Sequence, residues 1–174
     1  MSSPDRNPPA QVLTRTIRVA LFNGWSVAGV SLFAAGASLI EHDTFGAIVC
    51  FLVALVGGLE IQGARMLRQG RIRGMTALVC SQLMILSVVL GFTAGAFASV
   101  GPNHVVGRVP IHYVQTLISQ AHMTPLAALN YLATLLKIAY AAIGITVFLY
   151  QGGMAVYYQR QAPVIERLLA SGGH

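Results

Sequence analysis

Four long apolar stretches constrain this chain more than any other feature of its sequence. They cover about residues 19–40, 45–67, 75–100 and 126–158, and each meets the roughly 20-residue length that crosses the hydrocarbon core of a bilayer. Only 9% of the residues are charged, whereas soluble domains carry about 25%. The sequence therefore predicts an all-α membrane protein with four antiparallel transmembrane helices and no separate soluble domain.

Arginines mark one end of these stretches. Of the 11 Lys and Arg residues, all but Arg108 and Lys137 flank helix ends on one side. The two main clusters are Arg15 and Arg18 before the first stretch, and Arg65, Arg68, Arg71 and Arg73 between the second and the third. The positive-inside rule places such residues in the cytoplasm. We therefore expect cytoplasmic segments over residues 1–18 and 159–174, a membrane domain over residues 19–158, and arginines that fix topology and contact lipid.

The lengths of the apolar stretches and the charge pattern also predict where the protein is located in the cell. The first apolar stretch exceeds the usual 7–15 residues of a signal-peptide core, so we expect a retained helix. The net charge of +6 does not indicate nucleic acid, because no basic stripe with interleaved aromatic residues is present. We expect a multi-pass protein of a bacterial inner membrane or a plasma membrane, with the lipid bilayer as its first partner.

Residues 101–124 form the main segment outside the stretches. Glycines and prolines within residues 101–110 predict a loop. Residues 111–123 repeat apolar side chains at helical spacing, which predicts a short outer amphipathic helix at the membrane interface, between the third and fourth transmembrane helices. Thr124 can cap the fourth helix, and Pro125 suits its first turn.

The far end of the fourth helix is marked by glycines, aromatic residues and a proline. We expect the helix to stop at Gly152-Gly153 or at Pro163, because glycine weakens a helix and proline breaks it. Tyr157 and Tyr158 are expected to anchor the inner membrane interface, as aromatic belts do.

Each predicted helix carries one polar side chain at a similar depth. Counted from the helix ends, these residues are Asn23, Glu60, Gln82 and Gln151. A carboxylate at the bilayer centre costs about 2.5–3.5 kcal/mol on insertion scales, so Glu60 is the most informative of them. Two interpretations stay open. The layer can hold the helices together through hydrogen bonds, with Glu60 paired to Arg18 or Arg65 as one variant, or it can form a proton, ion or solute site.

Other signatures are weak. His42, His112 and His122 fall on the predicted outer side, and they are the only candidates for a metal site or an outer-side metalloenzyme, but their spacing matches no metal-binding motif. Cys50 and Cys80 also lack metal-type spacing. We expect no cofactor and no enzymatic activity.

The spacing of small residues indicates that helices of this chain pack closely against other helices. Gly29 and Gly36 lie seven apart in the first stretch, and Gly91 and Gly95 lie four apart in the third. Small residues let helix backbones approach closely in lipid. The favoured interpretation is therefore an oligomeric bundle or an accessory subunit of a larger membrane complex. Transport through the Glu60 layer is the first alternative.

The charge pattern generates a topology prediction. A cysteine introduced at Ser3 or at Ser171 should react with a membrane-impermeant reagent only from the cytoplasm, and one at Asn103 only from outside. Labelling of intact cells and of inverted vesicles measures this. The opposite labelling rejects the orientation, and labelling of all three positions from one side rejects the count of four spans.

Overall fold

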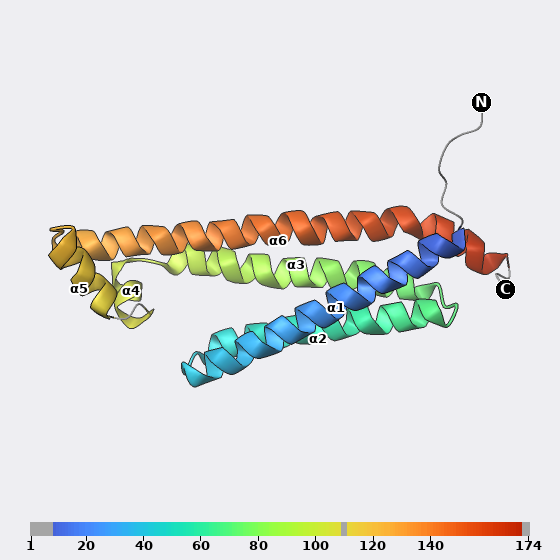
Figure 1. The fold of residues 1–174 in the computed structure, drawn as a ribbon, viewed down its shortest axis with the longest axis horizontal. Coiled ribbons are helices and arrows are strands. Elements are labelled where there is room, and N and C mark those ends of the chain that lie inside the picture. The colour runs from blue at the N-terminus through green and yellow to red at the C-terminus, as the bar shows by residue number, and fades with distance from the viewer. Residues whose placement is uncertain (1–8, 109–110, 172–174) are drawn as a thin grey trace, which may run out of the picture. The chain divides into compact units, whose positions relative to one another are not determined.

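The computed structural model describes residues 9–108 and 111–171, which are almost entirely helical and contain no strand (Figure 1). The helices are α1 (Pro9–Ile40), α2 (Thr44–Arg68), α3 (Arg73–Ser99), α4 (Pro102–Arg108), α5 (Ile111–Gln120) and α6 (Pro125–Ala170). Of these, α1, α2, α3 and α6 are long and apolar enough to cross a membrane. The expectation of an all-helical chain with four candidate spans is thus confirmed. Residues 1–8 and 172–174, the ends of the two expected cytoplasmic segments, lie outside the described residues.

Local sequence explains where two of these helices begin. The Asp43 carboxylate accepts a hydrogen bond from the Gly46 amide at 3.0 Å and caps α2. The Thr124 hydroxyl oxygen accepts one from the Ala127 amide at 3.3 Å, just before Pro125 opens α6. Both side chains satisfy backbone N–H groups that have no partner within the helix.

The segment after α3 differs from expectation at two points. Residues 102–108 form helix α4, so the predicted loop is wrong there. Pro102 opens this helix, where its missing N–H has no cost, and Val105 is fully buried beside Ala133 of α6. Helix α5 ends at Gln120, three residues short of the predicted end, and His122 then adopts a left-handed backbone with φ 51°.

The end of α6 was also predicted incorrectly. The helix continues through Gly152-Gly153 and Pro163 to Ala170. A proline inside a helix destabilises it by about 3 kcal/mol or more. The burial of side chains before and after Pro163 offsets this cost. Tyr158 and Ile165, seven residues apart on one face of α6, are both fully buried in the same apolar cluster.

The chain divides into two compact units. Unit 1 comprises Met1–Val89 and Phe148–His174, and unit 2 comprises Leu90–Val147. Unit 1 therefore contains α1, α2 and the adjoining parts of α3 and α6. Its largest core cluster draws on all four helices: Ala20, Ala64, Leu67, Met75, Leu78, Tyr158 and Ile165. Unit 2 has its own smaller core, which contains Val100, Val105 and Ala133.

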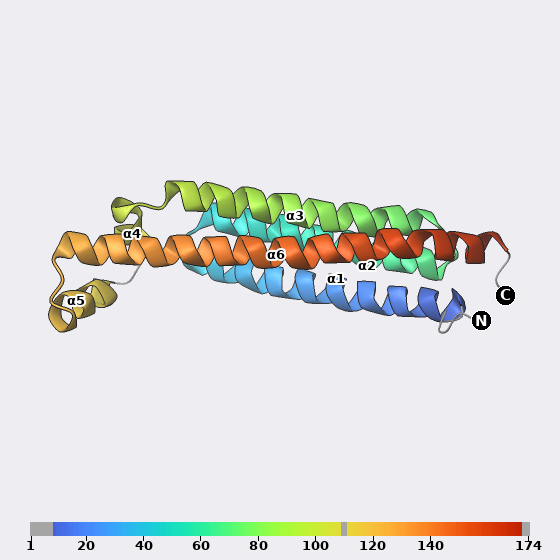
Figure 2. The same cartoon turned by 90° about the horizontal axis from the view of Figure 1, so that it is seen from above.

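Within unit 1, α1 and α2 lie side by side in both views (Figures 1 and 2). Glycines bring the two backbones together. A Cβ added to Gly24 would lie 3.0 Å from the Gly57 carbonyl oxygen, and one added to Gly57 would lie 3.0 Å from the Ala28 amide nitrogen. Neither position has room for a larger side chain, because these backbone atoms of the facing helix cannot move aside, and at Gly24 the added Cβ would also lie 2.8 Å from Ile61 Cγ1. This close contact positions the polar residues of α1 against those of α2.

Candidate functional site

Glu60 lies in the interior of unit 1, where its side chain is fully buried. Its two carboxyl oxygens have different partners. Oε2 accepts a hydrogen bond from Asn23 Nδ2 of α1 at 2.7 Å, and Oε1 accepts one from the Tyr158 hydroxyl of α6 at 2.7 Å. Both distances are short, as expected for bonds to a carboxylate. Glu60 of α2 is thus tied to two other helices.

The hydrogen bonds extend one residue further. The Tyr150 hydroxyl, also on α6, donates to Asn23 Oδ1 at 2.8 Å. Asn23 therefore donates with its amide nitrogen and accepts with its amide oxygen, which fixes its orientation. Tyr150 is 51% exposed, so three hydrogen-bonded side chains, Tyr150, Asn23 and Glu60, run from the surface of unit 1 to a buried carboxyl group, and Tyr158 lies beyond it.

The two glutamines of the predicted layer behave differently from Asn23. Gln82 is fully buried and lies within reach of a side-chain hydrogen bond to the Glu60 carboxyl group, but neither its Oε1 nor its Nε2 makes a hydrogen bond of good geometry with a described residue. Gln151 is also buried, and its Oε1 is likewise unpaired. The structure thus joins Glu60 directly to Asn23, sets Gln82 beside them, and links Gln151 to none of them by a hydrogen bond.

Two members of this site were missed in the sequence. Tyr158 was expected to anchor the membrane interface, but it is fully buried and donates to Glu60. Tyr150 had no assigned role. A signal was available: Tyr150 and Tyr158 are eight residues apart, so they share a helix face, and a buried tyrosine hydroxyl needs a partner. Tyr157, by contrast, is half-buried, and its hydroxyl makes one long hydrogen bond of 3.5 Å with the Thr16 hydroxyl.

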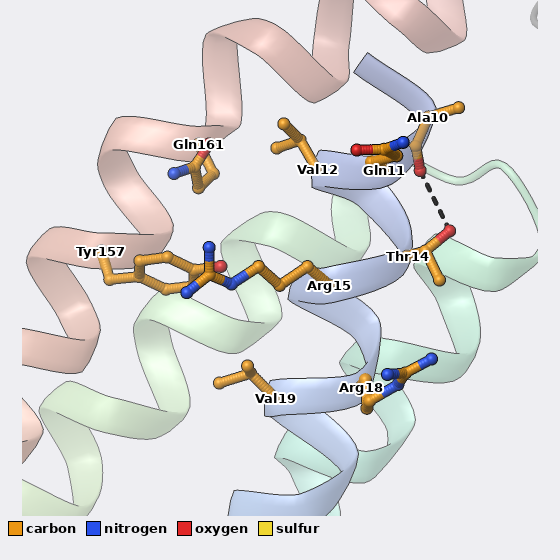
Figure 3. Close-up of a pocket in the computed structure, with 9 residues that line it drawn as sticks. All are labelled: Ala10, Gln11, Val12, Thr14, Arg15, Arg18, Val19, Tyr157 and Gln161. Atoms are coloured by element: carbon orange, nitrogen blue, oxygen red, sulfur yellow. Dashed lines mark hydrogen bonds between the residues drawn. The ribbon is translucent and has the colours of Figure 1, made fainter. Parts of the chain in front are cut away.

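The arginines lie apart from the carboxyl group. Neither Arg18 nor Arg65 pairs with Glu60, whose oxygens are occupied by Asn23 and Tyr158. Arg15 and Arg18 instead line a hollow between α1 and α6 (Figure 3). Arg65 and Arg68 lie in the last turn of α2, while Arg71 and Arg73 are exposed at the turn into α3.

The histidines of the weak metal hypothesis are placed separately. His42 lies in the turn between α1 and α2 with φ 59°, and the ring of His112 in α5 lies against the Tyr113 ring at 4.1 Å between centroids. His122 lies in the turn before α6. Among the residues that the structure describes, no three His, Cys, Asp or Glu side chains are grouped so that they could hold a metal ion.

Comparisons with known proteins do not identify this chain. No family model, curated protein or solved structure matches the chain. Its function therefore has to be argued from its own residues.

The two neighbouring tyrosines of α6 test the hydrogen bonds at Glu60. Tyr158→Phe removes the donor to Glu60 Oε1 and leaves a buried carboxyl oxygen unpaired, which should lower the free energy of unfolding by about 1–3 kcal/mol. Tyr157→Phe removes the same hydroxyl group one residue away and should cost well under about 1 kcal/mol. Unfolding in mixed micelles measures both. Equal losses would mean that the Tyr158 bond does not stabilise the fold.

Proposed function

We propose that this chain is a non-enzymatic, multi-pass membrane protein that works by association, either as a homo-oligomer or as an accessory subunit of a larger membrane complex. The observation that carries the proposal is the presence of two kinds of helical glycine. One kind packs closely against another helix of the same chain, as Gly24 and Gly57 do. The other kind faces open space on helices long enough to cross a membrane.

Four glycines of the second kind recur at the spacing of helix-packing motifs. A Cβ added at Gly29 or Gly36 of α1, or at Gly91 or Gly95 of α3, would meet no described atom within 4 Å beyond its own helix backbone. Glycine in a helix costs up to about 1 kcal/mol relative to alanine. Where open glycines recur four or seven residues apart on one helix, close packing against a second chain supplies the compensation.

The arrangement that accompanies this function has three further parts. The four spans are antiparallel, and both ends lie in the cytoplasm of a bacterial inner membrane or a plasma membrane, which the arginine positions support. Helix α5 lies along the outer membrane interface. In its support, Val114 is buried and Ile118 is half-buried, whereas His112 and Gln115 are exposed, so the apolar and polar sides of α5 are distinct.

Substitution of the outward-facing glycines tests the proposal. Paired changes to leucine at Gly91 and Gly95, or at Gly29 and Gly36, should weaken association by about tenfold or more, since an overpacked interface costs about 1–3 kcal/mol. The fold should stay intact, because the added side chains meet nothing in the chain. The mass of the native complex in nanodiscs is the measurement, and it also separates a homo-oligomer from a heteromeric complex.

Two controls accompany this experiment. Gly57→Leu should push α1 and α2 apart, because the added side chain would meet the backbone of Ala28. It should therefore lower the free energy of unfolding. Gly58→Leu, at an open position next to it, should change neither stability nor mass. A wild-type chain that stays monomeric at all concentrations and co-purifies with no other subunit contradicts the proposal.

A second candidate function is proton, cation or small-solute transport centred on Glu60. The unpaired amide of Gln82 favours it. A buried amide without a partner costs about 1–3 kcal/mol, and a group of this kind beside a carboxyl is typical of a place where a small polar species binds. The third possibility, a metal-dependent enzyme using His42, His112 and His122, has no comparable support.

Glu60→Gln separates the structural role of the carboxyl group from transport. The amide can keep both hydrogen bonds: its oxygen accepts from Asn23 Nδ2, and its nitrogen donates to the Tyr158 hydroxyl oxygen, because a hydroxyl group can accept as well as donate. We therefore expect little change in stability. If Glu60 carries a proton or a cation, the same substitution should abolish flux into liposomes, since an amide neither titrates nor offers a full charge. Absence of flux in the wild-type chain under every imposed ion gradient leaves transport without support.

A further inference from the structure

A hollow of about 730 Å³ lies between the first turns of α1 and the last part of α6, within unit 1. Arg15 extends from α1 toward Tyr157 of α6, with Gln161 one helical turn further along α6 (Figure 3). Val12 and Val19 lie on the same side of α1 as Arg15. The hollow thus combines a guanidinium group and polar side chains with apolar walls.

Positive charge in this hollow is not neutralised within the described chain. Arg15 and Arg18 are both exposed, and no ion pair joins either of them to a described carboxylate. They lie three residues apart on α1, so their side chains start from neighbouring positions on the helix surface. Figure 3 draws the Arg15 guanidinium toward α6 and that of Arg18 on the other side of α1. Because both side chains are exposed, they can turn toward one phosphate, which accepts guanidinium N–H groups in pairs.

The walls of the hollow mix polar and apolar side chains along α1, with Ala10 and Val12 before the arginines and Val19 after them. Gln11 lies toward the start of the helix, while Val19 begins an apolar run that contains no charge as far as Ile40. A second, smaller hollow of about 360 Å³ lies against α2, and its walls are Thr14, Ile17, Arg18, Leu21 and Arg68. Arg18 and Thr14 belong to both. Each hollow therefore runs from an arginine to apolar side chains at the start of a membrane span.

We propose that these hollows bind an anionic phospholipid. The head-group phosphate lies at Arg15 and Arg18, and the acyl chains follow the apolar residues of α1 toward the membrane interior. Basic pockets between transmembrane helices are places where phospholipid head groups bind. A soluble phosphate compound would use the arginines but not Val19 or Leu21, and that difference favours a lipid.

Lipid titration of the purified full-length chain, followed by native mass spectrometry, tests this. Phosphatidylglycerol should bind at least about tenfold more tightly than phosphatidylcholine with the same acyl chains. Each arginine near an anionic lipid contributes about a fivefold factor in affinity. We therefore expect Arg15→Gln and Arg18→Gln each to weaken phosphatidylglycerol binding about fivefold, and the double variant about 25-fold.

The turn between α2 and α3 offers a matched control. Arg71→Gln combined with Arg73→Gln removes the same charge from exposed positions that line neither hollow, and it should change binding less than about twofold. Equal losses in both double variants would show diffuse attraction and overturn the site. Equal binding of the two lipids would also overturn it. Displacement of the lipid by millimolar inorganic phosphate would assign the arginines to a soluble anion instead. If the double variant does not fold, the two single variants decide.

Discussion

The bilayer interior offers no water to a polar group, so a carboxyl placed there has to find its partners within protein. Glu60 finds them on two other helices, Asn23 on α1 and Tyr158 on α6. Each partner is a side chain on a different element, so the carboxyl group specifies which helices meet in unit 1 and at what depth. The apolar contacts around it are less directional than these hydrogen bonds, because hydrophobic burial depends on area rather than on the alignment of atoms.

The glycines of α1 and α2 make this arrangement possible. Hydrogen bonds of 2.7 Å between short side chains require backbones that approach closely, and Gly24 and Gly57 remove the side chains that would separate them. Gly24 follows Asn23 directly, and Gly57 precedes Glu60 by less than one helical turn. The packing contact and the polar contact therefore depend on each other. A larger residue at either glycine would disturb the carboxyl site without touching any of its members.

Sequence reasoning predicted the four long apolar helices and singled out Glu60, which the structure buries beside Asn23. Both follow from the contrast between apolar runs and rare polar residues. It missed α4 and the continuation of α6 through Pro163, because both depend on tertiary burial at Val105 and Ile165 that overrides local propensity. It also assigned Tyr158 to the membrane interface. A tyrosine near a helix end is compatible with an interface and with a buried hydrogen bond, and only the direction of its side chain distinguishes them.

The two bonds at Glu60 also differ in when they can form. Asn23 precedes Glu60 by 37 residues, whereas Tyr158 follows it by 98. A ribosome adds about 5–20 residues per second, so roughly 5–20 s separate the synthesis of the carboxyl group from that of its second partner. Until α6 has been synthesised, the Glu60 oxygen that accepts from Tyr158 lacks this partner. Helix α6 is therefore the one that completes the hydrogen bonds of the carboxyl group.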